Sequence, residues 1–390
     1  MIGGNQLRKI KVMSLIWSMG DGGAQQVVIN YLRDFNNDPD IDFRVYVYTK
    51  PTISKYDKEI EEKKFNVYYL NNPRTKIQIP YFKRFFQRPI SKAAWANAIR
   101  EFKPDIVHVH ISSLLEATMP GIIENKVPLR FDTLHSNPYR YKGRYKQIIV
   151  DAFKNQNVIP ICVTKAQVHE AQDWYGITRY EVVRNGVDIE GIRAKCCTKQ
   201  AARTYYGLKN DTFVVIGVGR LNPIKKYDLL IEAFSKVYSI NQNSILLLAG
   251  EGEERSNLQH IAEKLGVSDA VKFLGNIADV TKIYCAADVL AVTSDTESSS
   301  LVAIEAQVCG TRCVLSAGVP KESILLKNTQ RLPKDASVND WRDALMNDSY
   351  EGVPTVKIAD YEVHNMSKKM KEIYLKYYSD YMEKNHADTK

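Results

Sequence analysis

Two glutamates, Glu297 and Glu305, stand where a polar stretch meets an apolar helical pattern, and their type and spacing suit the binding of a ligand. A short apolar run, 289–292, precedes eight residues, 293–300, without an apolar side chain. Apolar residues return at a helical period from Leu301 onward. A strand, a polar turn and a helix in this order place the turn at the carboxyl edge of a parallel sheet, where ligands bind in open α/β sheets.

The separation of the two glutamates limits what they can do together. At helical rise, their backbones lie at most about 12 Å apart. That is too far for both carboxylates to act on one bond, but it suits gripping two parts of one extended ligand. The alternative is a solvated loop followed by an ordinary helix with an exposed glutamate. Spacing alone leaves both interpretations open.

A basic turn, 219–226, follows another predicted strand and suits an anion. Arg220 offers a fixed fork of donors and Lys225 a point charge, so together they suit a diphosphate. A leaving diphosphate gathers negative charge, so cations held there contribute to catalysis as well as to binding. The alternative is surface charge on a turn. Two further turns close the next predicted strands in the same way: Gly250-Glu251 and Gly275-Asn276.

Glycines and histidines mark the ends of strands in the first half of the chain. Gly22 and Gly23 lie between the first strand and the first helix, where glycines let backbone amides approach a phosphate. His108 and His110 are two residues apart in one strand, so they face the same side, and His135 ends the next strand. The histidines suit a polar role near a reacting group, a structural role, or metal binding, which no ligand spacing supports.

The elements that must position these residues alternate between strand and helix, which predicts mostly parallel sheets covered on both faces. The predicted strands are 9–16, 43–48, 66–70, 105–110, 129–134, 158–163, 180–184, 211–217, 244–249, 270–274, 288–292 and 312–316. The predicted helices are 25–32, 55–63, 81–101, 112–124, 143–154, 165–174, 226–239, 253–265, 278–286, 301–309 and 363–381.

A turn signal at 184–188 and the polar residues after it predict a hinge between two domains. We therefore expect an N-terminal Rossmann-like domain at 1–188, a second at 189–358, and a C-terminal helix and tail at 359–390. The two doubly wound domains would face each other across a cleft, and the amphipathic last helix would pack back across it onto the far domain.

Composition narrows the class of protein. The chain has 390 residues, a formal charge of +9 and no apolar run long enough for a signal peptide core or a membrane span. The six cysteines show no CxxC spacing and fit buried, reduced thiols better than disulfides or a zinc site. We expect a cytoplasmic protein with an anionic partner.

Basic and aromatic residues alternate within 73–98, which contains six Lys or Arg and no acid. A second such cluster spans 139–146. This pattern suits the headgroup region of an anionic membrane, and it also suits single-stranded nucleic acid. The alternative is a solvated helix whose aromatic side chains pack inward. Nucleic acid is supported only by net charge, so we expect no nucleic-acid partner.

Several motifs together resemble the retaining glycosyltransferases of family 4, which have the GT-B fold of two facing Rossmann-like domains. In the second domain they are VRNGVD (183–188), GVGRLNPIKKYDLLIEAF (217–234), LLLAGEGEE (246–254), VKFLGNIADV (271–280) and AADVLAVTSDTESSSLVAIEAQVCGTRCVLS (286–316). In the first they are GDGGAQQVV (20–28), PDIVHVH (104–110) and TLHSNP (133–138). The sequence of 305–322 is most similar to the corresponding segment of enzymes that build bacterial capsular and exopolysaccharide units.

The resemblance implies a role for each matching residue. Arg220 and Lys225 would hold the donor diphosphate, Glu305 the ribose hydroxyls and Glu297 the transferred sugar. His110 and His135 would line the reacting side. The remaining donor-binding positions would be Gly22, Gly23, Gly250, Glu251, Asn276, Ser298, Ser299, Ser300 and Leu301. The resemblance also implies retention of anomeric configuration, with no metal and no cofactor, so the two glutamates are not the nucleophile and acid of a glycosidase.

Two departures from the family pattern bear on activity. The family usually has Gly-Phe-Gly where Ser298, Ser299 and Ser300 stand, and a glycine where Lys226 stands. The triple serine would reshape or disable the sugar pocket.

The hypothesis is transfer of a hexose or N-acetylhexosamine from a nucleotide diphosphate sugar, with UDP as the expected nucleotide. The acceptor would be a lipid-linked glycan, reached by peripheral docking of segment 73–98 at the inner face of the membrane. The rivals are a catalytically silent GT-B subunit that assists a partner transferase, and a nucleotide-sugar epimerase.

Overall fold

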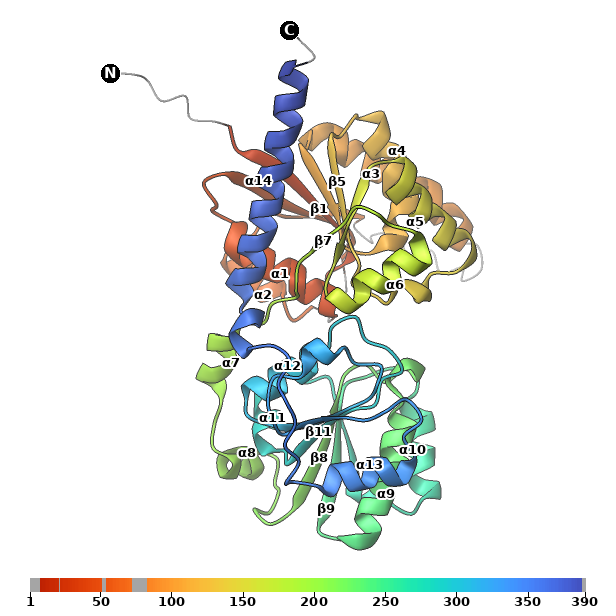
Figure 1. Ribbon diagram of the computed structural model, residues 1–390, viewed down its shortest axis with the longest axis vertical. Coiled ribbons are helices and arrows are strands. Elements are labelled where there is room, and N and C mark those ends of the chain that lie inside the picture. The colour runs from red at the N-terminus through yellow and green to blue at the C-terminus, as the bar shows by residue number, and fades with distance from the viewer. Residues whose placement is uncertain (1–7, 21, 51–53, 72–82, 388–390) are drawn as a thin grey trace, which may run out of the picture. The chain divides into compact units, whose positions relative to one another are not determined.

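A computed structural model describes residues 8–20, 22–50, 54–71 and 83–387, with the side chains of 71 and 83–90 outside the description. The chain forms two compact units (Figure 1). Unit 1 comprises Met1–Gly186 and His364–Lys390, and unit 2 comprises Val187–Val363. The first boundary therefore follows Gly186, within the turn that the sequence marked as the start of the hinge.

Unit 1 is built on a seven-stranded parallel sheet with the order β3-β2-β1-β4-β5-β6-β7. The apolar runs of the sequence form its central strands, because both faces are covered. The strands are β1 (Ile10–Ser18), β2 (Ile41–Thr49), β3 (Val67–Asn71), β4 (Ile106–Val109), β5 (Leu129–Thr133), β6 (Val158–Cys162) and β7 (Glu181–Val182).

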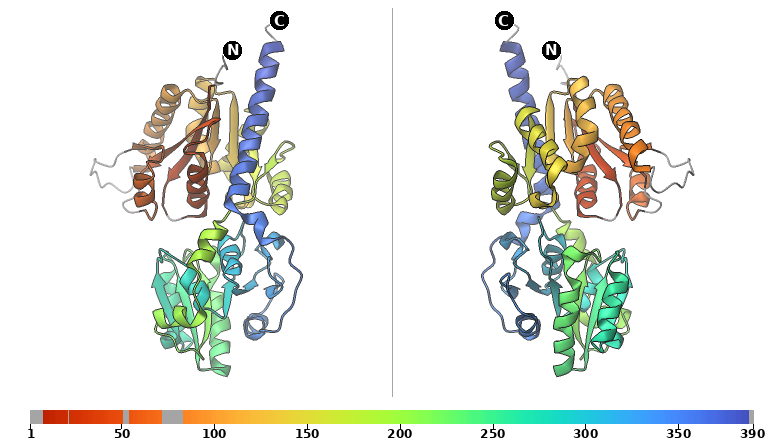
Figure 2. Two further views of the ribbon diagram at one scale, coloured as in Figure 1. Left: turned by 90° about the vertical axis from the view of Figure 1, so that its left-hand side faces the viewer. Right: turned by 90° about the vertical axis from the view of Figure 1, so that its right-hand side faces the viewer.

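Helices cover both faces of this sheet (Figure 2). Residues of α3, α4, α5 and α6 share one apolar core with one face of β1, through Met13 and Leu15. On the other face, Tyr31 of α1 packs against Phe43 and Tyr374 of α14 packs against Phe131. The helices are α1 (Gly23–Phe35), α2 (Asp57–Glu62), α3 (Lys83–Phe102), α4 (Leu115–Glu124), α5 (Gly143–Asn155), α6 (Lys165–Tyr175) and α14 (Val363–Ala387).

The last helix, α14, belongs to unit 1, although the chain reaches it from unit 2. Its apolar stripe is buried on the sheet of unit 1: Met366, Met370, Ile373 and Tyr374 are each at most 4% exposed. The sequence predicted that this helix would return to the first domain, and it does. The hydrophobic effect explains the arrangement, because the stripe removes a continuous apolar surface from water.

Unit 2 has a six-stranded parallel sheet with the order β10-β9-β8-β11-β12-β13. Alternate residues of β8 pack into opposite layers: Val215 joins the core that includes α9, while Val214 and Ile216 join the core that includes α11 and α12. The strands are β8 (Phe213–Val218), β9 (Ser244–Ala249), β10 (Val271–Gly275), β11 (Val289–Val292), β12 (Arg312–Leu315) and β13 (Thr329–Arg331). The helices are α7 (Ile189–Lys195), α8 (Lys199–Tyr205), α9 (Tyr227–Ile240), α10 (Arg255–Lys264), α11 (Thr281–Ala286), α12 (Leu301–Val308) and α13 (Val338–Met346).

Four of these elements were absent from the sequence prediction. Helices α7 and α8 lie where the sequence predicted an irregular hinge. Each has an N-cap side chain: Asp188 accepts a hydrogen bond from Gly191 N at 2.7 Å, and Thr198 accepts one from Ala201 N at 3.2 Å. Both helices have seven residues, too few for a clear helical period. Strand β13 and helix α13 were also missed, although Ser337 and Asp340 form a capping box that marks the start of α13.

The basic-aromatic segment 73–98 is only partly visible. Residues 73–82 lie outside the described residues, and the remainder belongs to α3. Trp95, one of the aromatic residues of the pattern, is fully buried and packs near Tyr48 with ring centroids 6.0 Å apart. For Trp95 the inward-packing alternative therefore holds. No helix within the described ranges is long and apolar enough to cross a membrane.

Candidate functional site

The predicted residues of unit 2 gather at the carboxyl edge of its sheet. Strands β10, β9, β8 and β11 are consecutive neighbours and parallel, so the loops that follow them lie side by side. The candidate residues of these loops, in the order of the strands, are Asn276; Gly250 and Glu251; Arg220 and Lys225; and Glu297 with Ser298, Ser299 and Ser300.

The loops after β8 and β9 are held together by their backbones. Leu221 N donates to Glu251 O at 2.9 Å, and Glu254 N donates to Leu221 O at 3.0 Å. Gly250 adopts φ 143°, and a Cβ placed on it would lie 1.9 Å from the carbonyl oxygen of Gly219. Gly250 therefore permits a close approach of two backbones, which fixes the conformation of the basic turn.

Lys225 and Glu297 form an ion pair that the sequence did not predict. Lys225 Nζ lies 2.6 Å from Glu297 Oε1, and Ser294 Oγ donates to the same oxygen at 2.7 Å. The side chains are 21% and 14% exposed, so both remain accessible to a ligand. The residue expected to bind the diphosphate, Lys225, and the residue expected to bind the sugar, Glu297, therefore lie in direct contact.

Backbone contacts hold each partner of this pair in place. Lys225 N donates to Asn222 Oδ1 at 3.3 Å, and Thr293 Oγ1 donates to Lys225 O at 2.7 Å. Glu297 N donates to Gly318 O at 2.9 Å. Sequence reasoning missed Asn222, Thr293 and Gly318. The Asn-Pro dipeptide at 222–223 was a turn signal that could have pointed to the first of them.

The three serines occupy the turn before α12 and leave polar groups without partners. Within the part of the chain that the structure describes, the Oγ atoms of Ser298, Ser299 and Ser300 are buried and have no hydrogen-bond partner. Ser300 precedes α12 without capping it through its side chain. Buried hydroxyls are normally satisfied by hydrogen bonds, so three such groups in one turn indicate a place where a polar ligand binds.

Glu305 is positioned from α11. Tyr284 donates its hydroxyl hydrogen to Glu305 Oε2 at 3.1 Å. Burial raises the pKa of Tyr284 well above its usual value, and the charge of Glu305 raises it further, so the phenol stays a donor. Tyr284 is a further residue that sequence reasoning missed. Helix α12 begins at Leu301, so the helical spacing assumed between Glu297 and Glu305 applies only from that residue.

The other predicted residues of unit 2 lie around this group with different surroundings. Arg220 and Asn276 are exposed, and Glu251 forms an ion pair with Arg255. Lys226, where the family usually has glycine, adopts φ 52° and ψ 42°. This left-handed conformation gives a physical reason for the glycine, because a side chain costs about 1–2 kcal/mol there.

In unit 1, the three predicted histidines form a buried chain of contacts. The rings of His108 and His110 lie 4.1 Å apart, which confirms that they face the same side. His110 Nδ1 lies 3.1 Å from His135 Nε2, while His108 contacts Tyr374 Oη at 2.5 Å and Thr133 Oγ1 at 2.7 Å. Both nitrogens of His108 are therefore used inside the protein.

The remaining nitrogens of the other two histidines stay available. Neither His110 Nε2 nor His135 Nδ1 has a hydrogen-bond partner within the described ranges. Burial lowers the pKa of His135 to about 3 and that of His110 well below its usual value, so both rings are neutral at pH 7. Gly22 and Gly23, also predicted here, begin α1 as its N-cap and first residue.

Asp132, in strand β5, is another buried titratable residue of unit 1, and it was not predicted. It is fully buried, and burial raises the pKa of its carboxyl to about 8, although the neighbouring Ser112 side chain works against this shift. The folded protein thus takes up a proton at Asp132 that the unfolded chain, with an ordinary pKa near 3.9, lacks at neutral pH. Stability from this group is present at low pH and is lost as the pH rises toward 8.

Replacement of Asp132 by asparagine should remove this pH dependence. Between pH 6.5 and pH 8 the wild type should lose on the order of 1–2 kcal/mol more of its free energy of unfolding than Asp132→Asn. Urea unfolding of both proteins at the two pH values measures the difference. The three histidines titrate in the same way in both proteins, so their contribution cancels in the comparison. Equal pH dependence in both proteins would contradict the protonated carboxyl.

The cysteines are arranged differently from the prediction. Cys162 and Cys313 are buried as expected, but Cys196, Cys285 and Cys309 are only partly buried and Cys197 is exposed. Cys196, Cys285 and Cys309, far apart in sequence, form a close group that could hold a metal ion. The described histidines and carboxylates do not form another such group. The expectation of buried thiols is therefore wrong for Cys197 and for these three cysteines.

Comparisons with known proteins agree with this architecture. The family model described as "Glycosyltransferase Family 4" matches residues 21–190, and the model "Glycosyl transferases group 1" matches residues 198–346. The two matches lie one after the other along the chain and cover most of each sheet.

Among curated proteins, the chain is similar to the D-inositol 3-phosphate glycosyltransferase of Mycobacteroides abscessus, with 37% identity over 172 residues. That match covers 43% of this chain and 38% of the relative. The protein of the same description from Gordonia bronchialis is 36% identical over 206 residues, 47% of this chain and 43% of that one. The chain thus spans about two fifths of the length of these relatives.

Solved structures resemble the chain over nearly its whole length. HepE of Anabaena, in complex with UDP and glucose, has a TM-score of 0.75 at 19% identity, covering 94% of this chain and 100% of that one. WaaG, a glycosyltransferase involved in lipopolysaccharide biosynthesis, has a TM-score of 0.66 at 18% identity, covering 86% and 90%. The chain therefore has the GT-B fold of the group 1 and family 4 glycosyltransferases, as its motifs predicted.

Proposed function

We propose that the protein is a glycosyltransferase that moves a sugar from a nucleotide diphosphate sugar to an acceptor hydroxyl. The observation that carries this proposal is the group at the carboxyl edge of unit 2. There, Lys225 and Glu297 are paired at 2.6 Å, and the next three residues are serines whose buried hydroxyls have no partner among the described residues. A cation, a carboxylate and free hydroxyls in one place match the phosphate and sugar of such a donor.

Each residue has a role that follows from its chemistry. Arg220 and Lys225 bind the diphosphate and stabilise the negative charge that grows on it as the sugar leaves. Glu297 accepts hydrogen bonds from hydroxyls of the transferred sugar. Glu305, oriented by Tyr284, accepts from the two hydroxyls of the ribose. The lysine and arginine take the place of a metal ion, and the donor phosphate itself takes the proton of the acceptor, with retention of configuration.

The expected donor is a uridine diphosphate hexose or N-acetylhexosamine. Support comes from HepE, which is similar over 94% of this chain and whose structure contains UDP and glucose. The expected acceptor is a lipid-linked glycan at the inner face of the membrane, within cell-surface polysaccharide synthesis. WaaG, which is involved in lipopolysaccharide biosynthesis, supports this class. The D-inositol 3-phosphate glycosyltransferases among its relatives suggest inositol phosphate as a second acceptor to test beside the lipid-linked glycan.

Incubation with a panel of UDP-, GDP- and ADP-sugars, scored by release of free nucleoside diphosphate, tests the class. We expect turnover with one donor, faster when the correct acceptor is added, and undiminished when Mg²⁺ and Mn²⁺ are left out of the buffer. The anomeric proton coupling of the product in NMR distinguishes retention from inversion. Absence of both turnover and binding with every donor would contradict the proposal.

The rival of a catalytically silent subunit is favoured by the triple serine, and calorimetry separates it. Wild type should bind UDP, and Lys225→Ala should bind it more weakly. If neither binds, the silent subunit is the better assignment. An epimerase would convert the donor without any acceptor, so product analysis in the absence of acceptor excludes or identifies it.

Membrane docking through segment 73–98 is tested with lipid vesicles. Most side chains of this segment lie outside the described residues. Support comes from the second basic-aromatic cluster, where Tyr139 is 41% exposed and Lys146 Nζ lies 3.6 Å from the ring centre of Trp174. We expect stronger co-sedimentation with anionic than with neutral vesicles, and weaker binding at high salt. Equal partition would contradict an electrostatic contact.

A further inference from the structure

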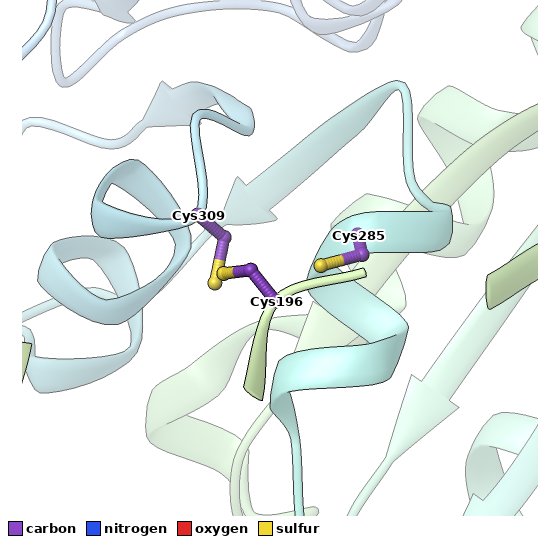
Figure 3. A group of neighbouring side chains, drawn as sticks. All are labelled: Cys196, Cys285 and Cys309. Carbon is purple, nitrogen blue, oxygen red and sulfur yellow. The ribbon is translucent and has the colours of Figure 1, made fainter. Parts of the chain in front are cut away.

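Three cysteines that are distant in sequence present their thiols to one place in unit 2 (Figure 3). The Sγ atoms of Cys196, Cys285 and Cys309 all lie within 4.8 Å of one another. Cys196 follows helix α7, Cys285 lies in α11, and Cys309 follows α12. Three separate elements thus converge on one point, which is the arrangement of a ligand set rather than of isolated thiols.

We propose that Cys196, Cys285 and Cys309 bind one Zn²⁺ ion as thiolates. Zn²⁺ favours sulfur ligands in a tetrahedral arrangement with Zn–S bonds of about 2.3 Å, which places the sulfur atoms roughly 3.8 Å apart. Side-chain rotation closes the remaining difference. On binding, three S–H bonds break, three Zn–S bonds form, and the protons pass to solvent. This inference does not depend on the proposed transferase activity.

Three thiolates leave the fourth position of a tetrahedral Zn²⁺ open to water or to Cys197, which follows Cys196 directly and lines the same surface pocket.

The ion would connect the elements that hold the donor side of the site. Cys285 follows Tyr284, and Cys309 N donates to the carbonyl oxygen of Glu305 at 3.2 Å. Tyr284 and Glu305 are the two residues joined by the hydrogen bond between α11 and α12. A Zn²⁺ ion bound here would fix these helices to each other and to the segment between α7 and α8.

The test uses the full chain, reduced and stripped of metal by a chelator. Titration with Co²⁺ as an optical probe should give one ion per chain and a thiolate-to-cobalt charge-transfer absorption that Zn²⁺ then abolishes. Cys196→Ser, Cys285→Ser and Cys309→Ser should each weaken binding at least tenfold. Cys162→Ser, a cysteine of unit 1, should bind as the wild type does. Binding that persists in the triple variant would overturn the proposal.

A second measurement covers variants that fail to fold. Wild-type protein is alkylated with and without Zn²⁺, and the modified cysteines are mapped by mass spectrometry. Zn²⁺ should protect Cys196, Cys285 and Cys309 from alkylation. Protection of none of them would overturn the zinc assignment.

Discussion

Replacing Lys225 with alanine should lower kcat by about 10²–10³-fold, the range observed when one group that stabilises transition-state charge is removed. The reason is that, under the proposed function, its partly buried ammonium group, held 2.6 Å from Glu297, meets the negative charge on the leaving diphosphate. Initial rates at saturating donor measure kcat, and calorimetry with UDP measures the accompanying loss of affinity.

Lys226→Ala is the matched control, because it removes the same charge from the next residue. Lys226 pairs with Asp228 at 3.0 Å and does not contact Glu297 in the described contacts. An exposed pair of this kind contributes at most about 1 kcal/mol to stability, so Lys226→Ala should keep nearly full kcat. If both variants lose activity equally, general charge rather than the position of Lys225 is responsible.

Replacing Gly250 with alanine should destabilise unit 2 by about 3 kcal/mol and also reduce activity. At φ 143° an alanine is strained, and its Cβ would lie 1.9 Å from the carbonyl oxygen of Gly219. That atom belongs to the backbone, so relief requires movement of the basic turn that carries Arg220. Chemical denaturation followed by tryptophan fluorescence and by circular dichroism measures the loss.

Gly266→Ala serves as the comparison for Gly250. Gly266 also has a positive φ, 70°, but nothing lies within 4 Å of the position that an alanine methyl group would take. Only the backbone strain remains, so about 1 kcal/mol should be lost and activity should persist. Comparable losses at the two positions would show that the close approach at Gly250 contributes little.

The repetition of strands and helices was readable in the sequence because each half of the pattern is a local property. Apolar runs became most of the parallel strands, and glycine turns after several of them marked the edge where ligands bind. The short helices α7 and α8 were not predicted, because seven residues show little helical periodicity. Their N-cap residues, Asp188 and Thr198, were the signals available.

The sequence by itself determined the GT-B fold and the residue types at the edge of each sheet, since motifs and strand ends are encoded locally. Only the tertiary structure decided which of these residues meet. The pairing of Lys225 with Glu297 joins loops after two strands, β8 and β11, that are neighbours in the sheet but distant in the chain. The same holds for Tyr284 with Glu305 and for the three cysteines. Such contacts depend on strand order and helix packing, which cannot be inferred from the spacing of residues along the chain.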